Sequence, residues 1–228
     1  LFRAAAETGS FTRGAERAFV SQPALSASIS KLETELGVRL FVRNKRHVAL
    51  TPAGRKLLQR AKLIVGECAR VKDELRKHLR ITRREEATAL PENMRTLVFM
   101  RPPAPLLELV PKGAVIGLYR ANPYEAPAAS YAKFFFEQGY DLALPRFADR
   151  DAAMHFAQFS DPFGESDLET GPFGLLQPMA DAAALEPRVL FVPLVGFTAE
   201  GARLGQGGGH YDRWLADHPG TTAIGHAW

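Results

Sequence analysis

The residues best suited to chemistry lie together in one glycine-rich stretch, from Gly201 to Arg213, which we call the glycine loop. Its sequence, GARLGQGGGHYDR, contains five glycines, which let a backbone adopt positive φ and come close to a ligand. Arg203, Asp212 and Arg213 place charges at its two ends. Free backbone N–H groups combined with such charges suit a bound phosphate.

The segments on either side of the stretch favour the same interpretation. The apolar run 189–195 predicts a buried strand and 211–215 begins a helical pattern, so a helix N-terminus would follow the glycines and face an anion. A Walker A loop is excluded because no Gly-Lys-Ser/Thr follows, and a dinucleotide loop because 220–228 holds no acidic residue. A flexible surface loop remains the alternative that the residues alone leave open.

The composition indicates a globular protein. A chain of 228 residues with 46% hydrophobic residues can form one large domain or two smaller ones. No run of 18 apolar residues and no secretory signal occurs, so we expect a cytoplasmic protein with no membrane partner. The single cysteine, Cys68, excludes an internal disulfide and a cysteine-cluster metal site, and its helical context predicts a small buried residue.

Charge is divided unevenly along the chain. Residues 1–70 carry 13 Lys and Arg against 5 Asp and Glu, whereas residues 87–228 carry 10 against 16. Such asymmetry predicts two modules with different partners, of which the first binds an anion such as nucleic acid.

The first module, residues 1–70, shows the pattern of a helix-turn-helix. Helical patterns cover 2–8 and 11–19, and a third begins at Ser21 as N-cap, has Pro23 in its first turn and ends at Gly37. The short link before Ser21 makes the second and third helices a helix-turn-helix pair. The third helix would then present Gln22, Ser26, Ser28 and Lys31 to base edges and phosphates.

A wing and a long helix complete this module. Two strand-like runs within 38–50 surround the basic tip 44–47, and Thr51-Pro52 starts the next helix. Its apolar stripe continues for five turns, which predicts a linker helix through which two chains could dimerise.

Residues 1–70 resemble the DNA-binding domain of LysR-type transcriptional regulators. The matching segments are AETGSFT (6–12), AER (15–17), VSQPALS (20–26), LGVRLF (36–41) and LTPAG (50–54). The resemblance implies an all-α winged helix-turn-helix whose third helix enters the major groove. It assigns Gln22, Pro23 and Ser26 to bases or backbone and Arg43, Lys45 and Arg46 to phosphates, with Lys31 beside them.

The second module, residues 71–228, begins with a basic helix and continues with alternating strands and helices. Lys72, Arg76, Arg80 and Arg83 share one side of the helix, either as a solvated face or as cations for DNA or for phosphates at the glycine loop. Strands are expected at 114–119, 141–145, 155–159, 188–194 and 221–225, with a helix at 128–138. This order predicts a Rossmann-like layered α/β sheet with ligands beyond the strand ends.

This module resembles 5-formyltetrahydrofolate cyclo-ligase. The matching segments are KxxLR (72–76), IGLY (116–119) followed by Glu125, LALPR (142–146) and VPLVGF (192–197) leading into GxRLGxGGGxYDR. The family converts 5-formyltetrahydrofolate to 5,10-methenyltetrahydrofolate with ATP and Mg²⁺, releasing ADP and phosphate. The resemblance therefore implies a phosphate cradle, a metal and a folate pocket that excludes water.

The same resemblance implies a role for individual residues. The ATP-binding set comprises Lys72, Arg76, Arg203, Gly205, Gly207, Gly208, Gly209, Tyr211, Asp212 and Arg213. Asp212 resembles the Mg²⁺ ligand, a role that suits a hard oxygen donor. Glu125 resembles the residue that holds the folate, and Arg120 and Arg146 are further substrate-binding candidates, although a structural ion pair is an equal alternative for Arg146.

The two resemblances leave three functions open. The family continues for roughly 30 residues beyond the position of Trp228, so we expect a cyclo-ligase domain without its C-terminal end. An enzyme that also carries a DNA-binding module is the favoured function. The alternatives are a transcriptional regulator that senses a folate or nucleotide through its second module, and a non-native fusion of two fragments.

Overall fold

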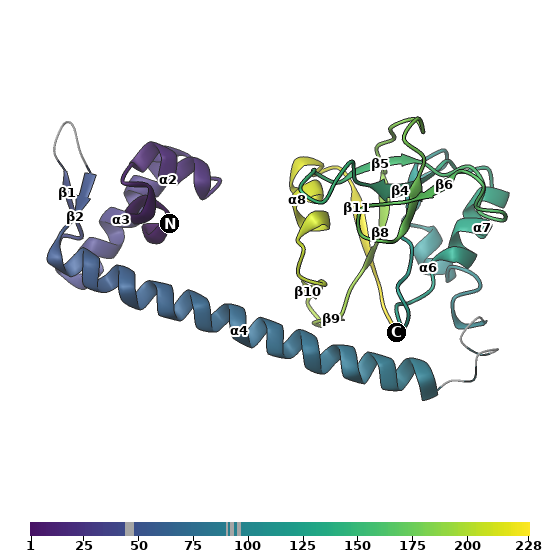
Figure 1. The fold of residues 1–228 in the computed structure, drawn as a ribbon, viewed down its shortest axis with the longest axis horizontal. Coiled ribbons are helices and arrows are strands. Elements are labelled where there is room, and N and C mark those ends of the chain that lie inside the picture. The colour runs from purple at the N-terminus through teal and green to yellow at the C-terminus, as the bar shows by residue number, and fades with distance from the viewer. Residues whose placement is uncertain (44–47, 90, 92–93, 95–96) are drawn as a thin grey trace. The chain divides into compact units, whose positions relative to one another are not determined.

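The computed structural model describes residues 1–43, 48–89, 91, 94 and 97–228 (Figure 1). The chain divides into two compact units, Leu1–Glu74 and Leu75–Trp228. The division falls within the helix α4, Pro52–Ala89, and each unit is described by itself. In the described ranges, no helix has the length and apolar character needed to cross a membrane.

The first unit is a winged helix-turn-helix, as predicted. Its helices are α1 (Phe2–Thr8), α2 (Phe11–Arg17) and α3 (Gln22–Leu36), and its wing pairs β1 (Phe41–Arg43) antiparallel with β2 (Val48–Leu50). Ser21 caps α3 by accepting the Ala24 N–H, and Gly37 ends it with φ 65°. The core of the unit consists of Phe2, Ala5, Ala15, Leu25, Ile29, Leu40 and Phe41.

Helix α4 starts as predicted but differs in what it buries. The Thr51 hydroxyl accepts the Gly54 N–H at 3.0 Å, which caps the first turn. The prediction that Cys68 is buried is wrong, because its side chain is exposed in the single chain. The neighbouring apolar residues Ile64 and Val71 are also exposed, at 64% and 47%. The apolar stripe of this helix therefore continues past the core of the first unit.

The second unit is built on a five-stranded sheet in the order β11-β8-β3-β4-β5. These strands are β3 (Ile116–Gly117), β4 (Leu142–Arg146), β5 (His155–Gln158), β8 (Val189–Pro193) and β11 (Thr222–His226). All neighbouring pairs are parallel except β4 with β5. Besides the end of α4, the described helices of this unit include α6 (Ala104–Leu107), α7 (Ala129–Glu137) and α8 (His210–Asp217).

The alternating side chains of the central strand β8 separate two cores on the two faces of the sheet. Val189 and Phe191 lie in one core with Phe135 of α7, whereas Leu190 and Val192 lie in the other with Trp214 of α8. Figure 1 shows α7 and α8 on opposite sides of these strands. The predicted layered α/β architecture is confirmed.

Two antiparallel hairpins were not predicted. One pairs β6 (Leu168–Thr170) with β7 (Leu176–Pro178), and the other pairs β9 (Gly196–Phe197) with β10 (Arg203–Leu204). The strand expected at 114–119 is shorter than predicted and covers only Ile116–Gly117. The second hairpin inserts a turn between β8 and the glycine loop, which we expected to follow the strand directly.

Candidate functional site

The glycine loop forms one wall of a hollow at the start of helix α8. Gly207 has φ 114° and Gly209, the N-cap of α8, has φ 64°, both in the region that side chains rarely adopt. A Cβ at Gly209 would lie 3.1 Å from Arg213 Nη1. The hollow, of about 160 Å³, is lined by Arg76, Pro193, Arg203 and residues 205–212. Its lining thus combines backbone N–H groups, a helix N-terminus and cations, which suits an anion.

Two arginines of α4 hold the loop through its carbonyl groups. Arg76 Nε donates to Gly205 O at 3.1 Å, and Arg80 Nη2 donates to Gln206 O at 3.0 Å. Arg80 also reaches the side chain of Gln206, with Nε and Nη2 at 3.1 and 2.9 Å from Oε1. The predicted residue Arg76 therefore lies at the loop, and Arg80, left open by the sequence, lies there too.

Asp212 is the one predicted metal ligand, and its surroundings fit a metal only in part. Its carboxylate makes a hydrogen-bonded ion pair with Arg203 through Oδ1, and its side chain is 68% exposed. Among the described residues, no group of three or more His, Cys, Asp or Glu residues could hold a metal ion. One exposed carboxylate fits Mg²⁺ that is held mainly by nucleotide phosphates and water, which is how proteins commonly bind this ion.

A buried carboxylate lies next to the glycine loop. The side chain of Glu125 is 3% exposed, and its Oε2 accepts the Asn122 N–H at 2.7 Å. Its Oε1 accepts the Gln206 side-chain amide at 2.7 Å and lies 3.8 Å from Arg83 Nη1. Burial and then the charge of Glu125 raise the pKa of Tyr211, so that tyrosine stays protonated. Glu125 is therefore a buried, hydrogen-bonded carboxyl group held near the phosphate hollow.

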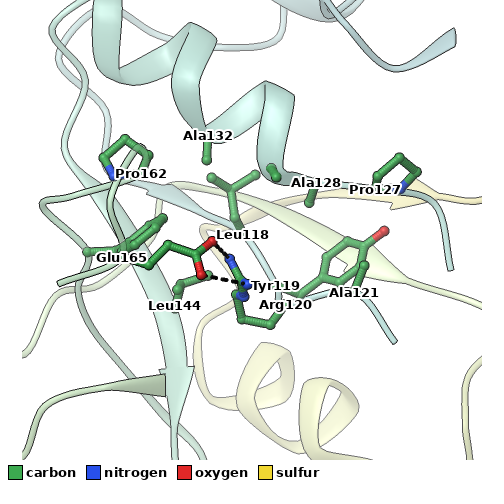
Figure 2. Close-up of a pocket in the computed structure, with 12 residues that line it drawn as sticks. Leu118, Tyr119, Arg120, Ala121, Pro127, Ala128, Ala132, Leu144, Pro162 and Glu165 are labelled. Atoms are coloured by element: carbon green, nitrogen blue, oxygen red, sulfur yellow. Dashed lines mark hydrogen bonds and ion pairs between the residues drawn. The ribbon is translucent and has the colours of Figure 1, made fainter. Parts of the chain in front are cut away.

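A second hollow, of about 170 Å³, lies between the end of β3 and α7 (Figure 2). Arg120 crosses it to pair with Glu165 through both carboxylate oxygens, one of them 3.0 Å from Nη2. Tyr119, expected in the core, is 4% exposed and donates to Ala126 O at 2.6 Å. Most of the residues that line this hollow are apolar, and Arg120 and Glu165 add one charged pair to the lining.

The remaining predicted residues of this unit are held elsewhere. Arg146 donates to Glu169 at 2.6 Å and also to Pro178 O, so it joins β4 to the β6–β7 hairpin. Arg213 lies 3.0 Å from His210 Nδ1. Lys72 belongs to the first unit, so its ATP-binding role stays a prediction.

The predicted DNA-binding residues lie mainly on the exposed side of α3. Gln22, Pro23 and Lys31 are exposed and Ser26 is half-buried, whereas Leu25 and Ile29 face the core. Arg43 ends β1, and Lys45 and Arg46 fall outside the described residues.

A buried carboxylate that the sequence did not mark supports this arrangement. Glu33 of α3 accepts the Leu40 and Phe41 N–H groups through Oε1, at 2.7 and 3.2 Å, and pairs with Arg39 at 3.1 Å. Burial acts to raise the pKa of Glu33, but these hydrogen bonds and Arg39 outweigh it and lower the pKa. The charged carboxylate therefore ties α3 to the wing.

Comparison with known proteins gives two matches along one chain. Residues 1–55 match the family model described as bacterial regulatory helix-turn-helix protein, lysR family, and residues 68–227 match the 5-formyltetrahydrofolate cyclo-ligase family. The structure resembles the NMR structure of Aquifex aeolicus 5,10-methenyltetrahydrofolate synthetase. That match has 25% identity and a TM-score of 0.52, and covers 69% of this chain and 78% of that one.

Curated relatives that match include transcriptional regulators. The Hca operon transcriptional activator HcaR of Escherichia coli (strain K12) is 35% identical over 156 residues, which cover 60% of this chain and 52% of HcaR. The regulator IlvR of Caulobacter vibrioides is 56% identical over 57 residues, or 25% of this chain and 19% of IlvR. The chain thus spans about half, or less, of these relatives. Because one family model covers most of its length, the chain belongs to the 5-formyltetrahydrofolate cyclo-ligase family, and it carries a LysR-type helix-turn-helix before that domain.

Proposed function

We propose that the second unit catalyses the ATP-dependent cyclisation of 5-formyltetrahydrofolate to 5,10-methenyltetrahydrofolate, with release of ADP and phosphate. The observation that carries this proposal is the position of a buried carboxylate, Glu125, beside a glycine loop that lines an anion-binding hollow. The loop would receive the phosphates and the carboxylate would receive the folate.

The residues of the chain would contribute mainly by positioning and by charge. Loop N–H groups and the cations Arg76 and Arg203 would neutralise the phosphates, with Lys72 and Arg213 as further ATP contacts. Glu125 would accept N–H donors of the pterin ring. Asp212 would hold Mg²⁺, which, when bound, neutralises negative charge on the nucleotide.

The chemistry would occur in two balanced steps. The N5-formyl oxygen attacks the γ-phosphorus and ADP leaves. The N10 nitrogen then attacks the activated carbon and releases its proton to solvent, the ring closes, and the phosphate departs with the formyl oxygen. Because water would destroy such an intermediate, a folate pocket that excludes water is needed. The apolar hollow of Figure 2, with Arg120 at its edge, is the proposed place for part of the folate.

An optical assay for the methenyl product tests this proposal on the whole chain, supplied with ATP, Mg²⁺ and 5-formyltetrahydrofolate. We expect product formation that requires both substrates and falls by about 100-fold in Arg203→Met, since one positioned charge commonly contributes that much. The matched control is Arg188→Met, which replaces an exposed arginine of the same unit. The absence of product from the unaltered chain would overturn the proposal.

We also propose that the first unit binds DNA. The exposed Gln22, Pro23 and Lys31 of α3 and the excess of basic residues in 1–70 support this second function. Binding should weaken steeply as salt increases, because released counterions drive such association. Fluorescence anisotropy with duplex DNA at several salt concentrations measures it, and no binding at low salt would exclude it.

The apolar stripe of α4 supports a homodimer as a further proposal. Leu57 and Ala61 pack partly against the core of the first unit, but Ile64, Cys68 and Val71 are exposed in the single chain. Leu57, Ala61, Ile64, Cys68 and Val71 recur at spacings of four, three, four and three, which is the repeat of a two-helix seam. Analytical ultracentrifugation should give a dimer that Ile64→Glu converts to a monomer.

Both proposed activities, DNA binding and the cyclisation, would take place in the cytoplasm, where DNA, ATP and reduced folates meet.

A further inference from the structure

We propose that Gln206 is a positioning residue that occupies Glu125 in the ligand-free chain, is displaced by the folate, and thereby couples folate binding to nucleotide binding. The inference rests on the proposed function, because it takes Glu125 as the group that receives the folate. It concerns a side chain to which the sequence analysis assigned no role.

The contacts of Gln206 lead directly from the loop to the carboxylate. Its Nε2 donates to Glu125 Oε1 at 2.7 Å, where an N–H donor of a folate would bind. The same side chain accepts two hydrogen bonds from Arg80 at its Oε1, at 3.1 and 2.9 Å. Gln206 is therefore held at both ends of its amide, and the folate must replace it on Glu125.

The residue is able to leave without disrupting the unit. Gln206 is exposed, and its backbone carbonyl is held separately by Arg80 at 3.0 Å. When its amide leaves, Glu125 keeps the Asn122 N–H and the nearby charge of Arg83. The Oε1 atom is then left without the Gln206 amide and can accept a new donor.

Nucleotide would favour this release through Arg80. Gln206 itself lines the phosphate hollow, and the Arg80 side chain that clasps it is exposed. An arginine makes an ion pair as well as hydrogen bonds with a phosphate, whereas the amide of Gln206 offers it only a neutral acceptor. Phosphates in the hollow would draw Arg80 from the Gln206 amide and loosen the contact with Glu125.

Titration calorimetry on the whole chain tests the coupling. The affinity for 5-formyltetrahydrofolate is measured with and without a non-hydrolysable ATP analogue, and then for Gln206→Met, which keeps the length of the side chain but removes its hydrogen bonds. In the unaltered chain we expect the analogue to raise folate affinity by about tenfold, a common size for coupling between two sites. The control is Gln138→Met, an exposed position at the end of α7.

The expected result for Gln206→Met is tighter folate binding without nucleotide and no further gain with it. In Arg80→Met, the gain in folate affinity that the ATP analogue causes should also be smaller than in the unaltered chain. Equal coupling in Gln206→Met and the unaltered chain would overturn the inference, as would weaker folate binding under both conditions, which indicates a merely structural role. If the unaltered chain binds neither ligand, the proposed function itself fails, and that result is distinct from a loss of coupling.

Discussion

Among the residues that the structure describes, each unit contains one buried glutamate, and the two are held in different ways. Glu33 accepts two backbone N–H groups through one oxygen and an arginine through the other, so the fold supplies its partners. Glu125 accepts one backbone N–H, and its second oxygen depends on the side chain of an exposed glutamine. A carboxylate that the backbone satisfies stabilises a fold, whereas one that an exposed side chain satisfies can exchange that partner for a ligand.

The largest expected effect follows from removing Glu33. In Glu33→Ala, the buried N–H groups of Leu40 and Phe41 lose their acceptor, and we expect the first unit to lose about 4 kcal/mol of stability. Both tryptophans lie in the second unit. The urea unfolding transition should therefore shift when it is followed by circular dichroism, but not when it is followed by tryptophan fluorescence. The control Glu35→Ala, at an exposed position of α3, should change stability by less than about 0.5 kcal/mol.

Replacing Glu125 should instead affect binding. In Glu125→Gln we expect folate affinity to fall by about 100-fold, close to 2.7 kcal/mol, because a charged acceptor is lost. Affinity for the ATP analogue should change by less than about twofold, and Glu137→Gln at the exposed end of α7 is the control. Comparable losses for both ligands would contradict the distinction between the two glutamates.

Acid should weaken the two units in different pH windows. Burial lowers the pKa of His226 from 6.5 to about 4, so the unfolded chain binds its proton more tightly and stability falls as the pH drops from 6.5 toward 4. The pKa of Glu33 is lowered from 4.5, so its contribution is complete above pH 4.5 and is lost only below that. Between pH 6.5 and pH 4.5, the titration of His226 should therefore weaken the second unit, while Glu33 still contributes fully to the first.

Urea titrations at pH 7.5 and pH 5 measure this window by tryptophan fluorescence. Because the pKa of His226 is lowered on folding, this residue should make the second unit about 2 kcal/mol less stable at pH 5 than at pH 7.5. His226→Asn keeps a donor for the Tyr119 hydroxyl, which lies 3.0 Å from His226 Nδ1, and should remove that part of the difference. An unchanged difference in this variant would assign the pH effect to other groups.

The smallest effect concerns DNA binding by the first unit. Lys31→Ala should weaken duplex binding uniformly, by about 1 kcal/mol, and lower the slope of log affinity against log salt by about one. Lys112→Ala, an exposed change in the second unit, is the control. An effect of Lys31→Ala that depends on DNA sequence would instead place this lysine on a base.

Local signals in the sequence predicted the elements well. Ser21, Pro23 and Gly37 mark the bounds of α3, and the apolar run around 189–193 marks β8, because caps and buried strands depend on neighbouring residues. The glycine loop and the arginines of α4 were also predicted to be relevant to one site. Arg120 could not be placed in this way, because Glu165, the partner drawn beside it in Figure 2, lies 45 residues further along the chain.

Contacts between residues that are far apart in the chain could not be predicted from the sequence. Gln206 carries no motif, and its link to Glu125 joins positions 81 residues apart. Cys68 fits a helical apolar pattern, but the pattern does not say whether the same chain covers it. Glu33 looked like one of several polar residues on α3, because only the return of the chain at 40–41 supplies its partners.

The arginines on the glycine-loop carbonyls have a second consequence for a bound anion, besides their own charge. A peptide group is planar and trans, so its N–H points opposite to its C=O. By holding Gly205 O and Gln206 O, Arg76 and Arg80 fix the amides of Gln206 and Gly207 facing the other way. Their dipoles are thus oriented when the chain folds, and a bound anion need not spend free energy to turn them.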